Sequence, residues 1–306
     1  MLNRRILRIK AFKAIYAYAE NPTMSLTDLE AYFEASCEAV RDLYLFLLSS
    51  IKPLTDEANA RIEAARAKFN PTEEERNPNM KFARNELAPF FSSDPDFSKL
   101  CSKKKFAWDQ YDVLLYNLYD TLTTRDYYKE YMSKGGSSLS EDAKLWISIF
   151  ENEFEDNTEL AGILEDLSLF WEDDLVYALI CCCRTLQEIA NGKQWYLPPL
   201  YMSDMPGNES LESDKAFAIK LLRKAYANYG KYMEMVDKRT PKWDLDRICV
   251  TDLCLIACGV AESESQPNLP SRITINEYVE ISKSYSTPES RQFVNGVLDR
   301  IINNKD

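Results

Sequence analysis

The sequence predicts an all-α protein, and two features support this prediction. Only 8 of the 306 residues are glycine, whereas the helix-favouring residues alanine, leucine, glutamate and lysine are frequent. Apolar residues recur at helical spacing along most of the chain, and a hydrophobic content of 45% is enough for a substantial core. The length suits one large domain or two of ordinary size.

A first helix is predicted over residues 3–20, with Asn3 as its N-cap. Arg4, Arg5 and Arg8 fall within one arc of roughly 100° on this helix, and most of the remaining circumference is apolar. Arginines at a helix N-terminus oppose the macrodipole, so helix stability does not explain them. They indicate a phosphate-binding cluster, and a solvated, solubilising helix end is the alternative.

The middle of the chain is predicted to be helical, with several breaks. A helix over residues 27–51 is followed by Pro53, which is expected to kink it or to divide it from a second piece that ends near Phe69. Residues 107–132 are rich in tyrosine, which suits base stacking, but the near-helical spacing favours core packing. The proline-containing residues 198–208 are the clearest linker.

Two acidic stretches, residues 151–159 and 171–174, raise the question of catalysis. Paired carboxylates serve glycoside hydrolysis or bind a divalent metal. The second stretch is explained more simply by the dipole of the helix predicted to begin at Leu175. Histidine is absent, which removes histidine-based nucleophile pairs, general bases and metal ligands. An enzyme would have to use carboxylates, lysine or tyrosine, so the commonest catalytic groups are missing, and we expect no cofactor and no metal site.

The eight cysteines form no Cys-x-x-Cys pair of the zinc-binding kind, and we expect buried, reduced thiols. No apolar run approaches the ~20 residues that span a bilayer. Arg8, Lys10 and Lys13 interrupt any signal-peptide core, so a cytoplasmic protein without membrane contact is expected. The formal net charge of −12 repels phosphate backbones, so binding of nucleic acid requires a local basic patch.

Residues 271–300 are predicted to form a helix, a turn and a terminal helix. Thr287 suits the N-cap of the terminal helix, Pro288 its first position, and Glu289 its first turn. The terminal helix then presents an apolar stripe made of Phe293, Val294, Val297, Leu298 and Ile301.

These residues resemble a known family. The run Ile-Asn-Glu-Tyr-Val-Glu-Ile-Ser-Lys at residues 275–283, followed by Phe-Val-Asn-Gly-Val-Leu-Asp at residues 293–299, resembles the C-terminal signature of the NusB family of bacterial transcription antitermination factors. The arginines of residues 4–8, with Ala-Ile-Tyr at residues 14–16, resemble the N-terminal helix of that family. Trp-Asp-Leu-Asp-Arg-Ile at residues 243–248 is a third match. Ile256 and Ala257 depart from the Leu-Arg that the family often has there.

The resemblance implies a NusB-like helical bundle of two subdomains, enlarged by an inserted helical region. We expect N-terminal NusB-like helices over residues 1–51, an inserted or elaborated helical region over residues 52–210, and a C-terminal NusB-like subdomain over residues 211–306.

The resemblance also implies a function. The family is not enzymatic; it binds boxA, a short single-stranded RNA element of rRNA leaders, together with the ribosomal protein NusE, and joins the RNA polymerase antitermination complex. Carried over by position, the RNA-binding residues are Arg4, Arg5, Arg8, Glu289, Ser290, Gln292 and Phe293. The carried-over NusE contacts are Tyr16 and Asp252.

Not every position suits these roles equally. Glu289 would repel phosphate, and Tyr16 and Phe293 also suit plain core packing. The alternative function is a helical protein-interaction scaffold that kept the fold and lost direct RNA binding. A carboxylate-based enzyme is a distant third.

Overall fold

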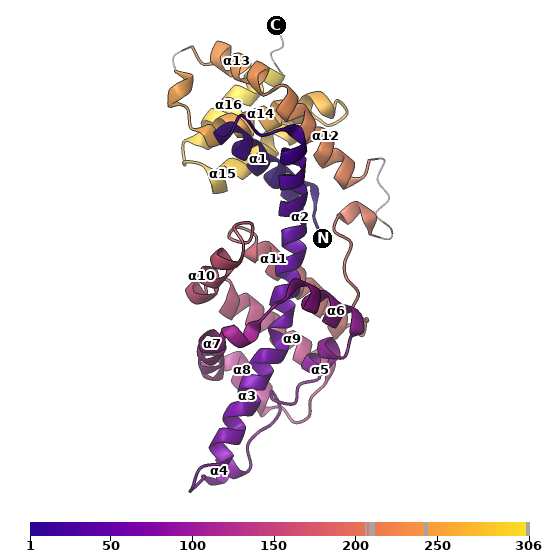
Figure 1. Ribbon diagram of the computed structural model, residues 1–306, viewed down its shortest axis with the longest axis vertical. Coiled ribbons are helices and arrows are strands. Elements are labelled where there is room, and N and C mark those ends of the chain that lie inside the picture. The colour runs from indigo at the N-terminus through magenta and orange to yellow at the C-terminus, as the bar shows by residue number, and fades with distance from the viewer. Residues whose placement is uncertain (206, 208–211, 242–243, 304–306) are drawn as a thin grey trace. The chain divides into compact units, whose positions relative to one another are not determined.

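The computed structural model describes residues 1–205, 207, 212–241 and 244–303 (Figure 1). Within these ranges the regular structure is helical, apart from one isolated parallel β-bridge between Leu2 and Tyr201. The all-α prediction is confirmed. None of the described helices is long and apolar enough to cross a membrane.

The chain forms two compact units. Unit 1 contains residues 1–38 and 198–306, and unit 2 contains residues 39–197. The chain passes from unit 1 to unit 2 within α2 (Leu26–Ser49) and returns after α11 (Leu175–Ala190). The extent of the family resemblance predicts three segments, residues 1–51, 52–210 and 211–306. This division stays a prediction.

Unit 1 is built from α1, the first half of α2, and the C-terminal helices. Their bounds are α1 Arg4–Glu20, η3 Met202–Asp204, α12 Asp214–Ala227, α13 Tyr229–Arg239, η4 Leu245–Arg247, α14 Val250–Ser265, α15 Ser271–Tyr285 and α16 Ser290–Ile302. Asn3 caps α1 as predicted, since its side chain accepts a hydrogen bond from the Ile6 N–H at 3.0 Å.

The segment of the third family match, residues 243–248, is described only from Asp244 onward. Trp243 itself lies outside the described residues, and a short 3₁₀ turn, η4, precedes α14.

Helix α14 is the centre of unit 1. Every residue from Asp252 to Glu262 is buried, and α1, α12, α13, α15 and α16 all pack against this helix (Figure 1). Its sequence is apolar around the whole circumference, which is typical of a helix enclosed by others. Cys254 and Cys258 lie here as buried thiols, and burial raises the pKa of Cys258 well above its ordinary value.

One buried ion pair connects three helices of unit 1. Glu262 on α14 is fully buried and accepts hydrogen bonds from Arg8 Nε at 2.8 Å and Nη2 at 2.7 Å. Tyr278 on α15 donates to the same carboxylate at 3.0 Å, and Thr274 at 3.4 Å. Burial by itself lowers the pKa of Arg8, but the hydrogen bond and charge of Glu262 outweigh it, so this pKa is raised. Arg8 is therefore charged and fixed in place.

Unit 2 contains the second half of α2 and the helices up to α11. Their bounds are α3 Ile51–Arg66, α4 Glu73–Arg76, α5 Leu87–Ser92, α6 Pro95–Lys104, η1 Trp108–Gln110, α7 Asp112–Thr124, α8 Asp126–Ser133, α9 Leu139–Ile149, the π-helical turn η2 Phe150–Phe154, and α10 Thr158–Leu167. The predicted division near Pro53 is confirmed, because α2 ends at Ser49 and Pro53 lies in the first turn of α3.

Aromatic rings fill the core of unit 2. Phe46 on α2 stacks on Trp108 with ring centroids 4.4 Å apart, and Trp171 lies 5.4 Å from the same ring. Trp108 and Trp171 each donate an indole hydrogen bond to a backbone carbonyl of α2, at Phe46 and Ala39 respectively. Of the tyrosines in residues 107–132, Tyr128 and Tyr131 are buried, as expected for core packing, whereas Tyr116 is exposed.

We predict that Glu262→Gln lowers the free energy of unfolding by about 3–5 kcal/mol, because it leaves the Arg8 charge buried without its counter-charge. Urea denaturation followed by circular dichroism measures this. The control Glu280→Gln removes an exposed partner of Lys283 and is expected to cost less than about 1 kcal/mol. Equal effects of the two substitutions would contradict the assigned role of Glu262.

A second prediction concerns the contact between α14 and α16. A Cβ on Gly259 would lie 2.7 Å from Leu298 Cδ2 and 3.2 Å from Tyr278 Cδ2, both in buried side chains. Gly259→Ala is expected to destabilise by about 1–2 kcal/mol, since overpacking exceeds the gain in helix propensity. Gly296→Ala on α16 meets nothing within 4 Å and is expected to stabilise by up to about 1 kcal/mol. Thermal denaturation of both variants checks the opposite signs.

Candidate nucleic-acid interface

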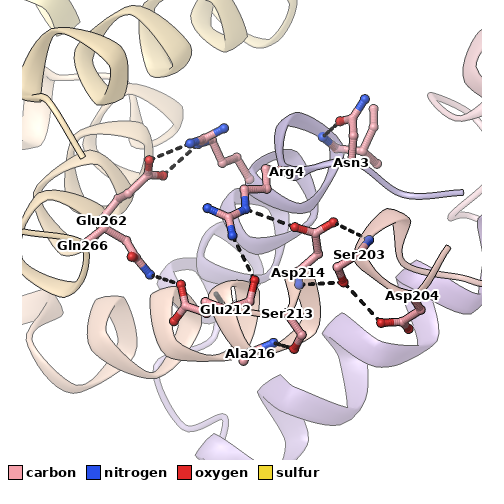
Figure 2. Close-up of polar contacts among 12 residues, drawn as sticks. Asn3, Arg4, Ser203, Asp204, Glu212, Ser213, Asp214, Ala216, Glu262 and Gln266 are labelled. Atoms are coloured by element: carbon pink, nitrogen blue, oxygen red, sulfur yellow. Dashed lines mark hydrogen bonds and ion pairs between the residues drawn. The ribbon is translucent and has the colours of Figure 1, made fainter. Parts of the chain in front are cut away.

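Arg4 lies at the start of α1 and is held by α12 and the residues that precede it. Its Nε donates to Asp214 Oδ1 at 3.0 Å, and its Nη2 donates to the Glu212 carbonyl at 3.1 Å (Figure 2). Its guanidinium also lies 4.7 Å from the centre of the Phe217 ring. The Arg4 side chain as a whole remains 37% exposed.

Arg5 is the most exposed of the three arginines, with 49% of its side chain accessible. Its Nε lies 3.5 Å from Glu277 Oε2 on α15. Arg8 is buried and bound to Glu262, with Glu277 at 3.4 Å from its Nη1. The three arginines that were predicted to form one phosphate-binding cluster therefore do not share an exposed surface, because the fully buried Glu262 draws Arg8 into the core.

The start of α16 contains the second group of predicted RNA-binding residues. The helix begins at Ser290, two residues later than predicted, after a turn in which the Ser290 N–H donates to the Thr287 carbonyl. Ser290 is buried, and its hydroxyl donates to Asp252 Oδ2 at 2.7 Å. Ser286 donates to the other oxygen of Asp252, also at 2.7 Å.

This geometry assigns Ser290 and Asp252 a structural role. Together they hold the start of α16 against the first turn of α14. Ser290 was expected to contact RNA and Asp252 to contact a partner, and both side chains are buried here. Those two roles stay predictions, and contact by these side chains would require the turn at residues 286–290 to open.

Phe293 and Gln292 line a pocket of about 350 Å³ between α16 and the end of α13. Arg239 and Arg300 line the same pocket, and Arg300 Nη1 donates to the Arg239 carbonyl at 3.3 Å. An aromatic side chain and two arginines in one pocket are the residue types that suit an aromatic base next to a phosphate. Glu289 lies exposed just before this helix, where its negative charge repels a phosphate.

The two arginines of this pocket were missed by the sequence analysis. Arg300 follows Phe293 by seven residues, which places both on one face of α16, and this spacing is a signal that the sequence carries. Arg239 ends a different helix, and only the tertiary contact between α13 and α16 brings it to the pocket.

The predicted RNA-binding residues thus divide into two places. Arg8 contacts Glu262 near the C-terminal end of α14, whereas Ser290 contacts Asp252 near its N-terminal end. Ten residues of α-helix separate Glu262 from Asp252, a rise of about 15 Å. Tyr16, near the C-terminal end of α1, is 37% exposed.

The acidic charge of the chain is unevenly distributed. Residues 39–197 contain 28 acidic and 18 basic side chains, a net charge of −10 out of the total of −12. Unit 1 contains 21 acidic and 19 basic side chains and is close to neutral. The global field that opposes phosphate therefore comes mainly from unit 2.

The acidic turn at residues 171–174 does not gather its carboxylates at one point. Asp174 is buried, whereas Glu172 and Asp173 are exposed. Across the described ranges, no group of three or more cysteine, aspartate or glutamate side chains is placed to hold a metal ion.

Comparisons with known proteins agree with the helical arrangement of unit 1. The sequence model of the NusB family matches residues 184–303. The chain is 34% identical over 91 residues to the transcription antitermination protein NusB of Methylacidiphilum infernorum, covering 30% of this chain and 64% of that protein. For the protein of the same name from Thermodesulfovibrio yellowstonii, the identity is 36% over 94 residues, which covers 30% of this chain and 62% of that protein. The chain is also 33% identical over 121 residues to the NusB protein of Leptospira biflexa, and this match covers 35% of this chain and 86% of that protein.

No solved structure matches the chain. The chain spans 64% and 62% of the length of the first two relatives, just under two thirds. The family match includes α12 to α16, and with them Asp252 and the Phe293 pocket, whereas α1 and its arginines precede it. The helical fold, the match over residues 184–303 and the coverage of 86% of the Leptospira biflexa protein show that the chain belongs to the NusB family.

Proposed function

We propose that this chain is an RNA-binding transcription antitermination factor rather than an enzyme. It binds a boxA-like single-stranded RNA of rRNA transcripts together with the ribosomal protein NusE, and acts on RNA polymerase in the bacterial cytoplasm. Membership of the NusB family and the names of the relatives support this proposal.

The pocket at the start of α16 is the observation that carries the proposal. Phe293 supplies a face on which a base stacks, and Gln292 supplies hydrogen-bonding groups for a base edge. Arg239 and Arg300 border the same pocket and supply positive charge for the adjoining phosphates. Single-stranded RNA is recognised in this way, by unstacked bases on aromatic rings and by phosphate contacts.

Arg5 and Arg4 extend the proposed site. Both side chains are partly exposed, although each is paired with a carboxylate. Arg8 contributes in this proposal by holding α1 against α14 and α15, because its own charge is occupied by Glu262.

Tyr16 is the residue proposed to contact NusE. Its exposure of 37% on α1 leaves part of the ring available to a partner, and exposed tyrosines are enriched at protein interfaces. Asp252 supports the same end of unit 1 indirectly, because it fixes the turn that precedes α16.

A protein-interaction scaffold without direct RNA binding is the second candidate. The observation that favours it is the pairing of Arg4, Arg5 and Arg8 with Asp214, Glu277 and Glu262. These pairs leave little net positive charge around the first turns of α1. The RNA experiment below separates the two candidates.

We predict that Phe293→Ala lowers the affinity for a boxA-like RNA by about 1–3 kcal/mol, since one stacked base is lost. Arg300→Ala is expected to weaken binding and to reduce the slope of log affinity against log salt by about one. Fluorescence anisotropy of a labelled RNA across a salt series, with and without NusE, measures both effects.

The matched controls for this experiment are Phe69→Ala and Arg66→Ala, which truncate an exposed phenylalanine and an exposed arginine in unit 2. Both should leave RNA affinity unchanged. If no RNA binds at low salt, even with NusE present, the antitermination proposal is wrong and the protein-interaction scaffold is supported.

We predict that Tyr16→Ala weakens the binding of NusE by about 1–2 kcal/mol and leaves RNA binding without NusE unchanged. Isothermal titration calorimetry with purified NusE checks this. Tyr196→Ala, at a tyrosine that is 61% exposed in unit 2, is the control. If Tyr16→Ala instead lowers stability with no change in NusE affinity, Tyr16 is a packing residue.

A further inference from the structure

The longest stretch of unit 2 without a basic residue runs from Leu145 to Cys183. It contains 10 acidic residues and no lysine, arginine or histidine over 39 positions. Several of its carboxylates are exposed, namely those of Glu151, Glu155, Asp156, Glu165, Asp166, Glu172 and Asp173. The segment therefore accounts for a charge equal to the whole net charge of unit 2.

The same segment exposes apolar side chains. Among the described residues, ten large hydrophobic side chains are exposed, and four of them fall within residues 167–180. These are Leu167 at 45%, Leu169 at 85%, Val176 at 47% and Ile180 at 43%. Single exposed apolar residues are ordinary, but a concentration of them around one turn indicates a contact surface.

The turn that carries Leu169 is well fixed. Trp171 is buried, and its indole nitrogen donates to the Ala39 carbonyl at 2.9 Å. Backbone hydrogen bonds from Trp171 to Ser168 and from Asp174 to Trp171 close the turn. Leu169 is thus kept exposed by a turn that packs its neighbour Trp171 into the core. Val176 and Ile180 follow one turn apart on the same face of α11.

We propose that Leu167, Leu169, Val176 and Ile180, with Glu165, Asp166 and Glu172, form a docking surface for a basic polypeptide segment that bears apolar side chains. We name it the acidic–apolar surface. The apolar residues supply buried area, and the carboxylates select a positively charged partner and speed its association. The surface belongs to unit 2 and the Phe293 pocket to unit 1, so this inference does not depend on the proposed function.

Charge decides the class of partner. Nucleic acid and anionic lipid surfaces carry negative charge and are repelled by a segment with ten acids and no base. The exposed leucine, valine and isoleucine contribute little to binding a small hydrated cation. A lysine- or arginine-rich protein segment with an apolar face suits both the carboxylates and the exposed apolar side chains of the surface.

The experiment uses the full chain and a synthetic amphipathic peptide of about five helical turns, with lysine on one face and leucine on the other. Fluorescence anisotropy across a salt series is the measurement. We expect this peptide to bind, and its affinity to fall as salt rises. The variant Leu169→Ser/Val176→Ser/Ile180→Ser and the variant Glu165→Lys/Asp166→Lys/Glu172→Lys should each lower the affinity at least about tenfold.

Matched variants in the same unit control for general charge and exposure. Phe69→Ser/Val113→Ser removes exposed apolar side chains elsewhere, and Glu63→Lys/Glu73→Lys/Glu74→Lys reverses three exposed acids elsewhere. Both should stay within about twofold of the unmodified chain, because they leave the docking surface intact. All substituted side chains are exposed, and circular dichroism confirms that each variant is folded.

Two further probes decide the specificity. A peptide of the same composition, scrambled so that it has no apolar face, should bind at least about tenfold more weakly. Equal binding of the scrambled peptide, or equal losses in the control variants, would overturn the proposal, because simple charge attraction would then suffice. Binding of single-stranded RNA or of anionic vesicles that depends on these residues would overturn it as well.

Discussion

The buried pair of Arg8 and Glu262 is the interaction on which unit 1 depends. Removing two charges from water is costly, and the cost is offset here by a bidentate hydrogen bond together with donors from Tyr278 and Thr274. Because these donors come from α1 and α15 and the acceptor from α14, the pair fixes how residues 1–20 pack on the C-terminal helices. Segments more than 250 positions apart in the chain become one bundle.

This constraint changes how the arginines of α1 are interpreted. From the sequence, three arginines on one arc resemble an exposed phosphate-binding cluster. In the structure each has an acidic partner, and the depth of that partner decides the function that remains open to each arginine. Glu262 is fully buried and immobilises Arg8, whereas Glu277 is partly exposed and leaves Arg5 the most exposed of the three. Asp214 is buried as well, but the Arg4 side chain that it pairs with stays partly exposed. The acidic partner of each arginine thus decides whether that arginine is buried and structural, like Arg8, or partly exposed, like Arg4 and Arg5.

The helical class, the cap at Asn3 and the division near Pro53 could all be predicted, because each follows from local spacing and short-range chemistry. The pocket beside Phe293 could be predicted only in part. Gln292, Phe293 and Arg300 share one helix, but Arg239 arrives from α13 through tertiary packing. Likewise, the burial of Asp252 and Ser290 follows from a contact across 38 positions that no local pattern reveals.

The division of charge between the two units resolves the conflict between an acidic chain and an RNA-binding family. Screening at physiological ionic strength has a length of about 8 Å, so exposed charges act mainly on their immediate surroundings. A strongly acidic unit 2 is therefore compatible with a nearly neutral unit 1 whose pocket holds two arginines. The two proposals therefore assign each unit its own class of ligand, anionic RNA for the pocket of unit 1 and a cationic polypeptide for the acidic–apolar surface of unit 2.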